Sequence, residues 1–187
     1  MEKAILKTLI YADIFDYPLN TYELHRWLIG KKLTLRQVEK AVSELRFKSR
    51  LQVKGKYYFL PKRGELVGIR NRRGKQSRIY IRKARLVSQF LKLVPWIKLV
   101  GISGGLAMDN VGKSDDIDLF IITGKNRLWL SRILALGLIS VLGQRRKKGE
   151  KGRKIAGKLC SNILLEEDRL EQRNKDVFIA HEVLQME

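Results

Sequence analysis

The sequence predicts an α+β chain in which a helical N-terminal part is followed by a part where strands and helices alternate. Residues 2–50 repeat apolar positions at helical spacing and contain two helix-capping patterns. Residues 97–103 and 116–123 are short apolar runs typical of strands, and a glycine turn follows the first of them. We expect a first domain at 1–61, a basic helical linker at 62–95 that packs on the second domain, and an α/β core with a mixed sheet at 96–187. A core that is truncated at its end is an alternative.

Composition narrows the class of partner. The chain has 187 residues, of which 44% are hydrophobic, so it can build a packed core. An excess of 39 Lys and Arg over 19 Asp and Glu gives a formal charge of +20, which favours nucleic acid, nucleotides or an anionic membrane surface. The lone Cys160 excludes an internal disulfide and implies no thiol chemistry, and the N-terminus has no signal-peptide pattern. We therefore expect a cytoplasmic protein.

The first sixty residues predict three helices and a hairpin. A helix at 2–14 is followed by one opened by Asn20 and Glu23 and by a third opened by Thr34 and Gln37, each pair a capping box. Two short strands then meet around Lys54–Gly55.

This order of elements is that of a winged helix-turn-helix, whose third helix reads DNA. The candidate nucleic-acid-binding residues are Arg36, Gln37, Lys40, Lys54 and Lys56. Such modules also serve in docking or dimerisation, and Glu39 and Glu44 reduce the positive field of the third helix, so both interpretations stay open.

Residues 62–98 carry many basic side chains and one acid, Glu65. Helical periodicity runs from Ile81 to Leu91 and stops before Pro95. A basic helix here can lie along a phosphate backbone or simply present a solvated face.

The run at 128–143 is nearly all apolar and a basic loop follows it. It is shorter than the roughly 20 residues of a spanning helix, and Arg132 interrupts it. We interpret it as a helix buried between a sheet and other helices and do not expect a membrane partner, although peripheral attachment through 128–148 is a weaker alternative. A strand at 159–165 and an amphipathic helix at 175–186 complete the pattern.

Asp116 and Asp118 are the candidate metal ligands. They lie two apart in a predicted strand, so both carboxylates project from one face. Two carboxylates held this close disfavour joint ionisation unless a cation offsets them, and Mg²⁺ takes oxygen ligands together with phosphate oxygens of a substrate. The turn at Gly104–Gly105 can offer backbone N–H groups to phosphate.

The run from Gly104–Gly105 through ten further residues to Asp116-Ile117-Asp118 resembles the motif of the nucleotidyltransferase superfamily related to DNA polymerase β. The resemblance covers the chain from about residue 80 onward. It implies transfer of a nucleotidyl group from Mg²⁺-bound ATP or another nucleoside triphosphate to a hydroxyl of an unknown acceptor, either RNA or protein. Asp116 and Asp118 would be catalytic metal ligands, and Ser103, Gly104 and Gly105 would bind the nucleotide.

Active members of that family add a third carboxylate on a later strand. The corresponding strand here contains no acid, and Asn162 stands where one is expected, with Glu166, Glu167 and Asp168 only at its end. Because an amide cannot take a proton from a hydroxyl, the alternative is a winged-helix DNA-binding regulator with a catalytically inactive nucleotidyltransferase domain. Whether the chain is an enzyme stays open, as does an ordinary pairing of Asp115–Asp118 with Lys113 or an arginine.

Overall fold

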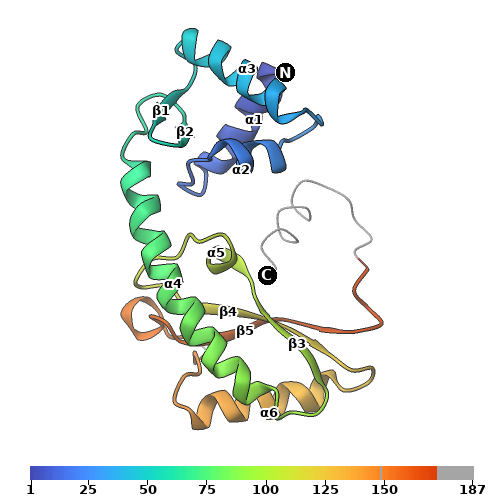
Figure 1. Ribbon diagram of the computed structural model, residues 1–187. Helices are drawn as coiled ribbons and strands as arrows, with labels where there is room; N and C mark the ends of the chain where they lie inside the picture. Colours follow the sequence, from blue (N-terminus) through green and yellow to red (C-terminus); the bar gives the residue numbers. More distant parts are fainter. Residues whose placement is uncertain (148, 172–187) are drawn as a thin grey trace. The chain divides into compact units, whose positions relative to one another are not determined.

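The computed structural model describes residues 1–147 and 149–171, and it confirms the predicted α+β class. Within these residues the chain forms six α-helices, a two-stranded sheet and a three-stranded sheet (Figure 1). It divides into two compact units, Met1–Arg72 and Arg73–Glu187, called here the N-terminal and C-terminal units. The helix predicted at 175–186 lies outside the described residues.

The N-terminal unit begins with three helices and a hairpin, in the predicted order. Its elements are α1 (Glu2–Asp13), α2 (Thr21–Arg26), α3 (Leu35–Phe47), β1 (Gln52–Lys54) and β2 (Tyr57–Phe59). Both predicted capping boxes form, from Asn20 with Glu23 and from Thr34 with Gln37. The strands pair antiparallel around a turn in which Gly55 has φ +62°, a backbone conformation that suits glycine. Leu19 adds an antiparallel bridge to Tyr58.

Helix α4 (Leu66–Leu91) extends well beyond the periodic stretch that the sequence showed. The helix begins at Leu66, within the basic helical linker expected at 62–95, whereas regular apolar periodicity was visible only from Ile81. Polar side chains occupy buried positions in its first half, among them Arg70 and Ser77, so the apolar stripe is interrupted there. Pattern alone therefore underestimates this helix.

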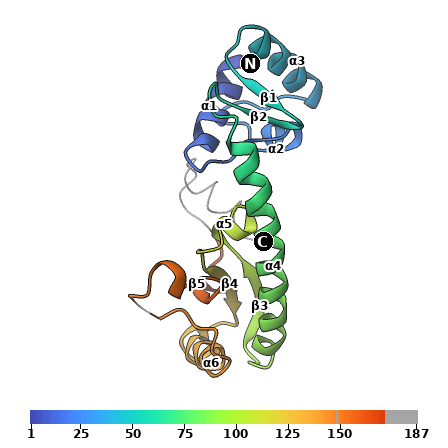
Figure 2. The same ribbon diagram turned by 90° about the vertical axis from the view of Figure 1, so that its left-hand side faces the viewer.

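A mixed three-stranded sheet forms the centre of the C-terminal unit (Figure 2). Its elements are β3 (Ile97–Ile102), α5 (Gly104–Ala107), β4 (Ile117–Thr123), α6 (Leu128–Val141) and β5 (Leu159–Glu166). Strand β4 lies in the middle, antiparallel to β3 and parallel to β5. The mixed sheet was expected from the sequence.

The two faces of this sheet differ in what they bury. Ile117, Leu119 and Ile121 alternate along β4 and pack with buried residues of α4 and α6 in one core. The residues between them are only half-buried, and Asp118 is among these. Since successive side chains of a strand point to opposite faces, Asp118 lies on the face away from that core.

Helix α6 is buried on one side only, so the expectation of a helix buried between a sheet and other helices holds for that side and was wrong for the other. Ser131, Ala135 and Ile139 face the core, whereas Trp129 and Ile133 on the opposite side are 73% and 66% exposed. An apolar composition identifies a helix but does not say which of its sides is covered. Among the described residues, no helix has the length and apolar character needed to cross a membrane.

Candidate functional site

The structure brings the two predicted metal ligands together. Asp116 immediately precedes β4 and Asp118 lies within it, and the thiol of Cys160 on β5 approaches both. One ligand atom from each of these three side chains lies within 4.8 Å of the others. All three side chains are half-buried, so the cluster can be reached from solvent while part of each group is desolvated.

The glycine turn lies directly against this cluster. Gly104 has φ +63°, and a Cβ built on it would lie 3.0 Å from Asp118 Oδ2. A side chain at this position would therefore displace the carboxylate. Gly105, the next residue, is in the first turn of the short helix α5. The predicted phosphate-binding turn and the acidic pair thus form one continuous site.

Ser103 connects β3 to the turn. Its backbone N–H donates to the carbonyl oxygen of Asp118 at 2.9 Å, and its side chain is 2% exposed. The Ser103 hydroxyl has no hydrogen-bond partner among the described residues. An unpaired buried hydroxyl costs free energy, so a ligand that offers it a partner would be favoured here.

An arginine partly neutralises the acidic pair. Arg146 Nη1 donates to Asp116 Oδ2 at 2.6 Å, and this hydrogen bond raises the pKa of Arg146. Burial, followed by the charge of Asp116, raises the pKa of Asp118 from its ordinary 3.8 to about 6, although Arg146 opposes the shift. The site therefore holds more negative charge than a single arginine offsets.

Cys160, rather than Asn162, is the residue of β5 that lies beside the acids. The parallel register pairs Asp118 with Cys160. The register shifts after Leu119, which pairs with Ser161, whereas Phe120 pairs with Ile163, and the exposed Asn162 falls in this bulge. Burial first, then the negative charge of Asp118, raises the pKa of the Cys160 thiol.

The acidic residues at the end of β5 bind the start of α6 and the loop before it. Glu166 Oε1 accepts from the backbone N–H of Leu128 at 3.4 Å, and Glu167 Oε1 accepts from that of Lys125 at 3.2 Å. Asp168 approaches the side chain of Lys125 at 3.7 Å. These contacts give them a structural role at the carboxyl end of β5.

Asp115 belongs to the loop that supports the site. Its Oδ2 accepts from the backbone N–H of Gly112 at 2.7 Å, and its carbonyl oxygen accepts from Gly157. Tyr80 of α4 donates to the carbonyl oxygen of Lys113 at 2.8 Å. The loop is therefore anchored at both ends. The basic residue that pairs with Asp116 is Arg146 and not Lys113.

The predicted nucleic-acid-binding residues belong to the N-terminal unit, and all of them are exposed: Arg36, Gln37, Lys40, Lys54 and Lys56. Gln37 Oε1 accepts from the backbone N–H of Thr34 at 2.9 Å, so its side chain already serves the cap of α3. Lys56 lies 5.4 Å from the centre of the Tyr57 ring.

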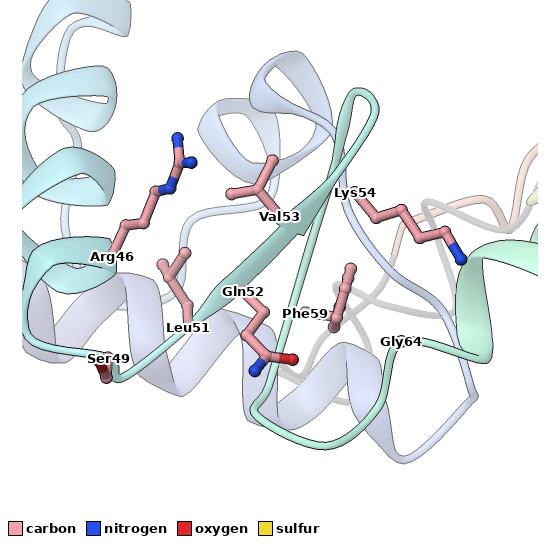
Figure 3. A pocket seen from close by; sticks show the side chains of 8 residues that line it. All are labelled: Arg46, Ser49, Leu51, Gln52, Val53, Lys54, Phe59 and Gly64. Carbon is pink, nitrogen blue, oxygen red and sulfur yellow. The ribbon is translucent and has the colours of Figure 1, made fainter.

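An open hollow with basic residues on two sides adds to this surface. Figure 3 shows Arg46 at the end of α3 and Lys54 on β1, with Leu51 and Val53 between them. Arg46 was not among the predicted contacts. Its exposed position in the last turn of α3 extends the positive field from that helix toward the hairpin.

Sequence reasoning missed two members of the acidic site. Arg146 stood within a basic loop with no signal to separate it from its neighbours, and Cys160 was expected to be inert. The only sequence cue for Cys160 was its place near the start of a strand, and this cue can be interpreted only when the register with β4 is known.

Comparisons of the chain with models of protein families, with curated proteins and with solved structures give no match.

Proposed function

We propose that the C-terminal unit binds a nucleoside triphosphate with a divalent metal ion, ATP and Mg²⁺ by the resemblance, and transfers the nucleotidyl group to a hydroxyl. The observation that carries this proposal is the contact between the acidic pair and the glycine turn. Asp118 of the candidate metal site lies directly against Gly104, whose backbone is suited to binding phosphate. The donor set fits a metal ion, since two carboxylates lie within reach of one position.

Each residue has a defined role in this proposal. Asp116 and Asp118 would hold the metal, which when bound would offset negative charge on the triphosphate. Gly104, Gly105 and the unpaired hydroxyl of Ser103 would receive phosphate oxygens. The acceptor oxygen attacks the α-phosphorus, the bond between the α-phosphorus and the oxygen bridging to the β-phosphate breaks, pyrophosphate leaves, and the hydroxyl proton passes to water, since both carboxylates would hold the metal.

The N-terminal unit would recruit an anionic acceptor. Its helices, its hairpin and the bridge from Leu19 to Tyr58 have the order of a winged helix-turn-helix. Exposed basic residues of α3 and the hairpin suit a phosphate backbone, which favours an RNA acceptor in the cytoplasm over a protein.

Calorimetry with Mg²⁺ and ATP tests the proposal. The wild-type chain is compared with Asp116→Asn and Asp118→Asn, which keep the shape of the side chains and remove their charge. Metal-dependent ATP binding should disappear in both variants. Asp109→Asn is the control, because it removes a carboxylate from an exposed turn of the same unit. Equal binding by all four proteins would reject the site.

A second candidate function is a DNA-binding regulator whose C-terminal unit has lost turnover. The observation that favours it is the thiol of Cys160 in place of a carboxylate beside Asp118. Duplex DNA affinity would then survive Asp116→Asn but fall when Arg36 and Lys40 are both changed to Ala. Each lost phosphate contact should reduce the slope of log affinity against log salt by about 1. An unchanged slope would argue against this candidate.

A further inference from the structure

The cluster at the sheet combines hard oxygen ligands with one soft sulfur ligand. Strands β4 and β5 are parallel, and their register places Cys160 directly beside Asp118. Paired residues of neighbouring strands project to the same face of the sheet. The thiol is therefore held beside the carboxylates by the backbone pairing of the sheet.

Ser103 continues the same row on the other side of Asp118. The backbone hydrogen bond from Ser103 to Asp118 extends the antiparallel register of Ile102 with Leu119 by one position. Ser103, Asp118 and Cys160 thus form a row across the three strands, on the face away from the core. The buried, unpaired hydroxyl of Ser103 is an independent sign that this row is completed by a ligand.

Sulfur changes which metal this row favours. Mg²⁺ takes oxygen ligands almost alone, whereas thiolate ligands select softer ions, with zinc the commonest divalent example. A zinc site with three protein ligands keeps a fourth position open for water or substrate. Two carboxylates and one thiolate around an open position meet this description, and they do not match an all-oxygen magnesium site.

We infer that Asp116, Asp118 and Cys160 bind zinc or a similar first-row divalent ion in preference to Mg²⁺. The inference rests on the proposed function only in assuming that the acidic pair holds a metal. The open position would face the glycine turn, where a phosphate oxygen or a water molecule can complete the coordination. The hydroxyl of Ser103 is placed to hydrogen-bond that fourth ligand.

Arg146 reaches the same cluster without blocking all of it. Its guanidinium contacts Oδ2 of Asp116, which leaves Oδ1 as a possible ligand atom. Its backbone N–H donates to the carbonyl oxygen of Leu159, the residue before Cys160. The side chain is 37% exposed, so it can turn away while its backbone stays in place.

Cobalt titration of the metal-free chain tests the inference, because a thiolate bound to Co²⁺ gives a charge-transfer absorption that a carboxylate does not. The chain contains a single cysteine, so any such band reports on Cys160. A phosphine reductant keeps the thiol reduced without competing for the metal. We expect the band to appear with one equivalent of Co²⁺, to disappear when Zn²⁺ is added and to resist a large excess of Mg²⁺.

Three variants sharpen this experiment. Cys160→Ser should remove the band and weaken Zn²⁺ binding by at least about tenfold. Cys160→Asp should shift the preference toward Mg²⁺, because it creates a third carboxylate. Asn162→Asp is the matched control, since it adds the same charge to the same strand at an exposed bulge. It should leave the metal preference unchanged.

Three results would overturn the inference, and the first two differ in what they say of the proposed function. If Mg²⁺-dependent ATP binding requires Asp116 and Asp118 but wild type shows no thiolate band, the zinc inference alone fails. If wild type binds neither metal nor Mg²⁺–ATP, the metal site of the proposed function fails with it. A Cys160→Asp variant that still prefers Zn²⁺ as strongly as wild type would also count against the inference.

Discussion

Two arginine–carboxylate pairs of nearly equal length occupy very different environments in this molecule. In the N-terminal unit, Arg70 Nη2 lies 2.7 Å from Glu23 Oε1. In the C-terminal unit, Arg146 Nη1 lies 2.6 Å from Asp116 Oδ2. The side chain of Arg70 is 9% exposed and that of Arg146 is 37% exposed. Distance alone therefore does not distinguish a structural ion pair from one at a binding site.

The surroundings of the pairs make the distinction. Arg70 also donates to the carbonyl oxygen of Pro18 and lies 3.5 Å from the centre of the Tyr17 ring. Its partner Glu23 closes the capping box of α2. Arg146, in contrast, meets a cluster in which Asp118 carries further negative charge that it does not neutralise. Removing one partner of a buried, matched pair destabilises a fold, whereas an excess of charge indicates a site for another cation.

The largest effect should come from breaking the matched pair. Arg70→Ala leaves Glu23 partly buried without its cation, and such losses cost about 3–5 kcal/mol in the free energy of unfolding. Denaturant unfolding followed by Trp27 fluorescence, in a background without Trp96 and Trp129, measures it. Trp27 contacts Tyr17 and so reports on the same cluster. Arg26→Ala, which changes an exposed arginine of α2, should cost no more than about 0.5 kcal/mol.

A loss below about 1 kcal/mol for Arg70→Ala would contradict this distinction, because it would show that the buried pair is replaceable by solvent.

Removing the charge of Asp118 should raise the free energy of unfolding, by less than Arg70→Ala lowers it. The folded pKa of Asp118, about 6, lies above the ordinary 3.8, so the folded state binds a proton more tightly than the unfolded chain. Stability is therefore lost as the pH rises from about 4 to about 6, and the penalty is fully present above that range. Asp118→Asn should be more stable than wild type at pH 7, by about 2 kcal/mol after allowing for solvent screening.

The difference should become small near pH 4 and vanish below about pH 3, where Asp118 is protonated in both states. Urea unfolding of the C-terminal unit at pH 4 and pH 7 measures it, with Asp109→Asn as the control for removal of one negative charge. Saturating Zn²⁺ or Mg²⁺ at pH 7 should stabilise wild type but not Asp118→Asn. An equal difference at both pH values would show that desolvation of Asp118 is not the cause.

The sequence predicts those features of the structure that depend on residues close together in the chain. The capping boxes at Asn20 and Thr34 involve residues three apart, so they are visible in the chain and the structure confirms them. The spacing of Asp116 and Asp118 is equally local, since the strand period alone places both carboxylates on one face.

Long-range pairing accounts for what was missed. Asn162, the position where a third acid was expected, is not the residue beside Asp118: the register pairs Asp118 with Cys160, and Asn162 falls in the bulge that follows Ser161. This pairing depends on the alignment of two strands that are distant in the sequence, and no local pattern marks it. The exposed side of α6 was missed for a related reason: composition does not show how many neighbours a helix has.

Arg146 provides the finest test of the comparison, because it separates charge balance from stability. Arg146→Ala should lower the free energy of unfolding by less than Arg70→Ala does, because Arg146 is 37% exposed, although Asp116 is only 13% exposed and loses its cation. The same variant should bind Zn²⁺ or Mg²⁺ about tenfold more tightly, since the metal no longer competes with the guanidinium for Asp116. Arg145→Ala is the matched control, because the neighbouring arginine reaches Ser140 and not the acids. Metal affinity that rises equally in both variants would reflect only the net charge of the loop, whereas a rise confined to Arg146→Ala would show that this arginine occupies the position of the missing cation.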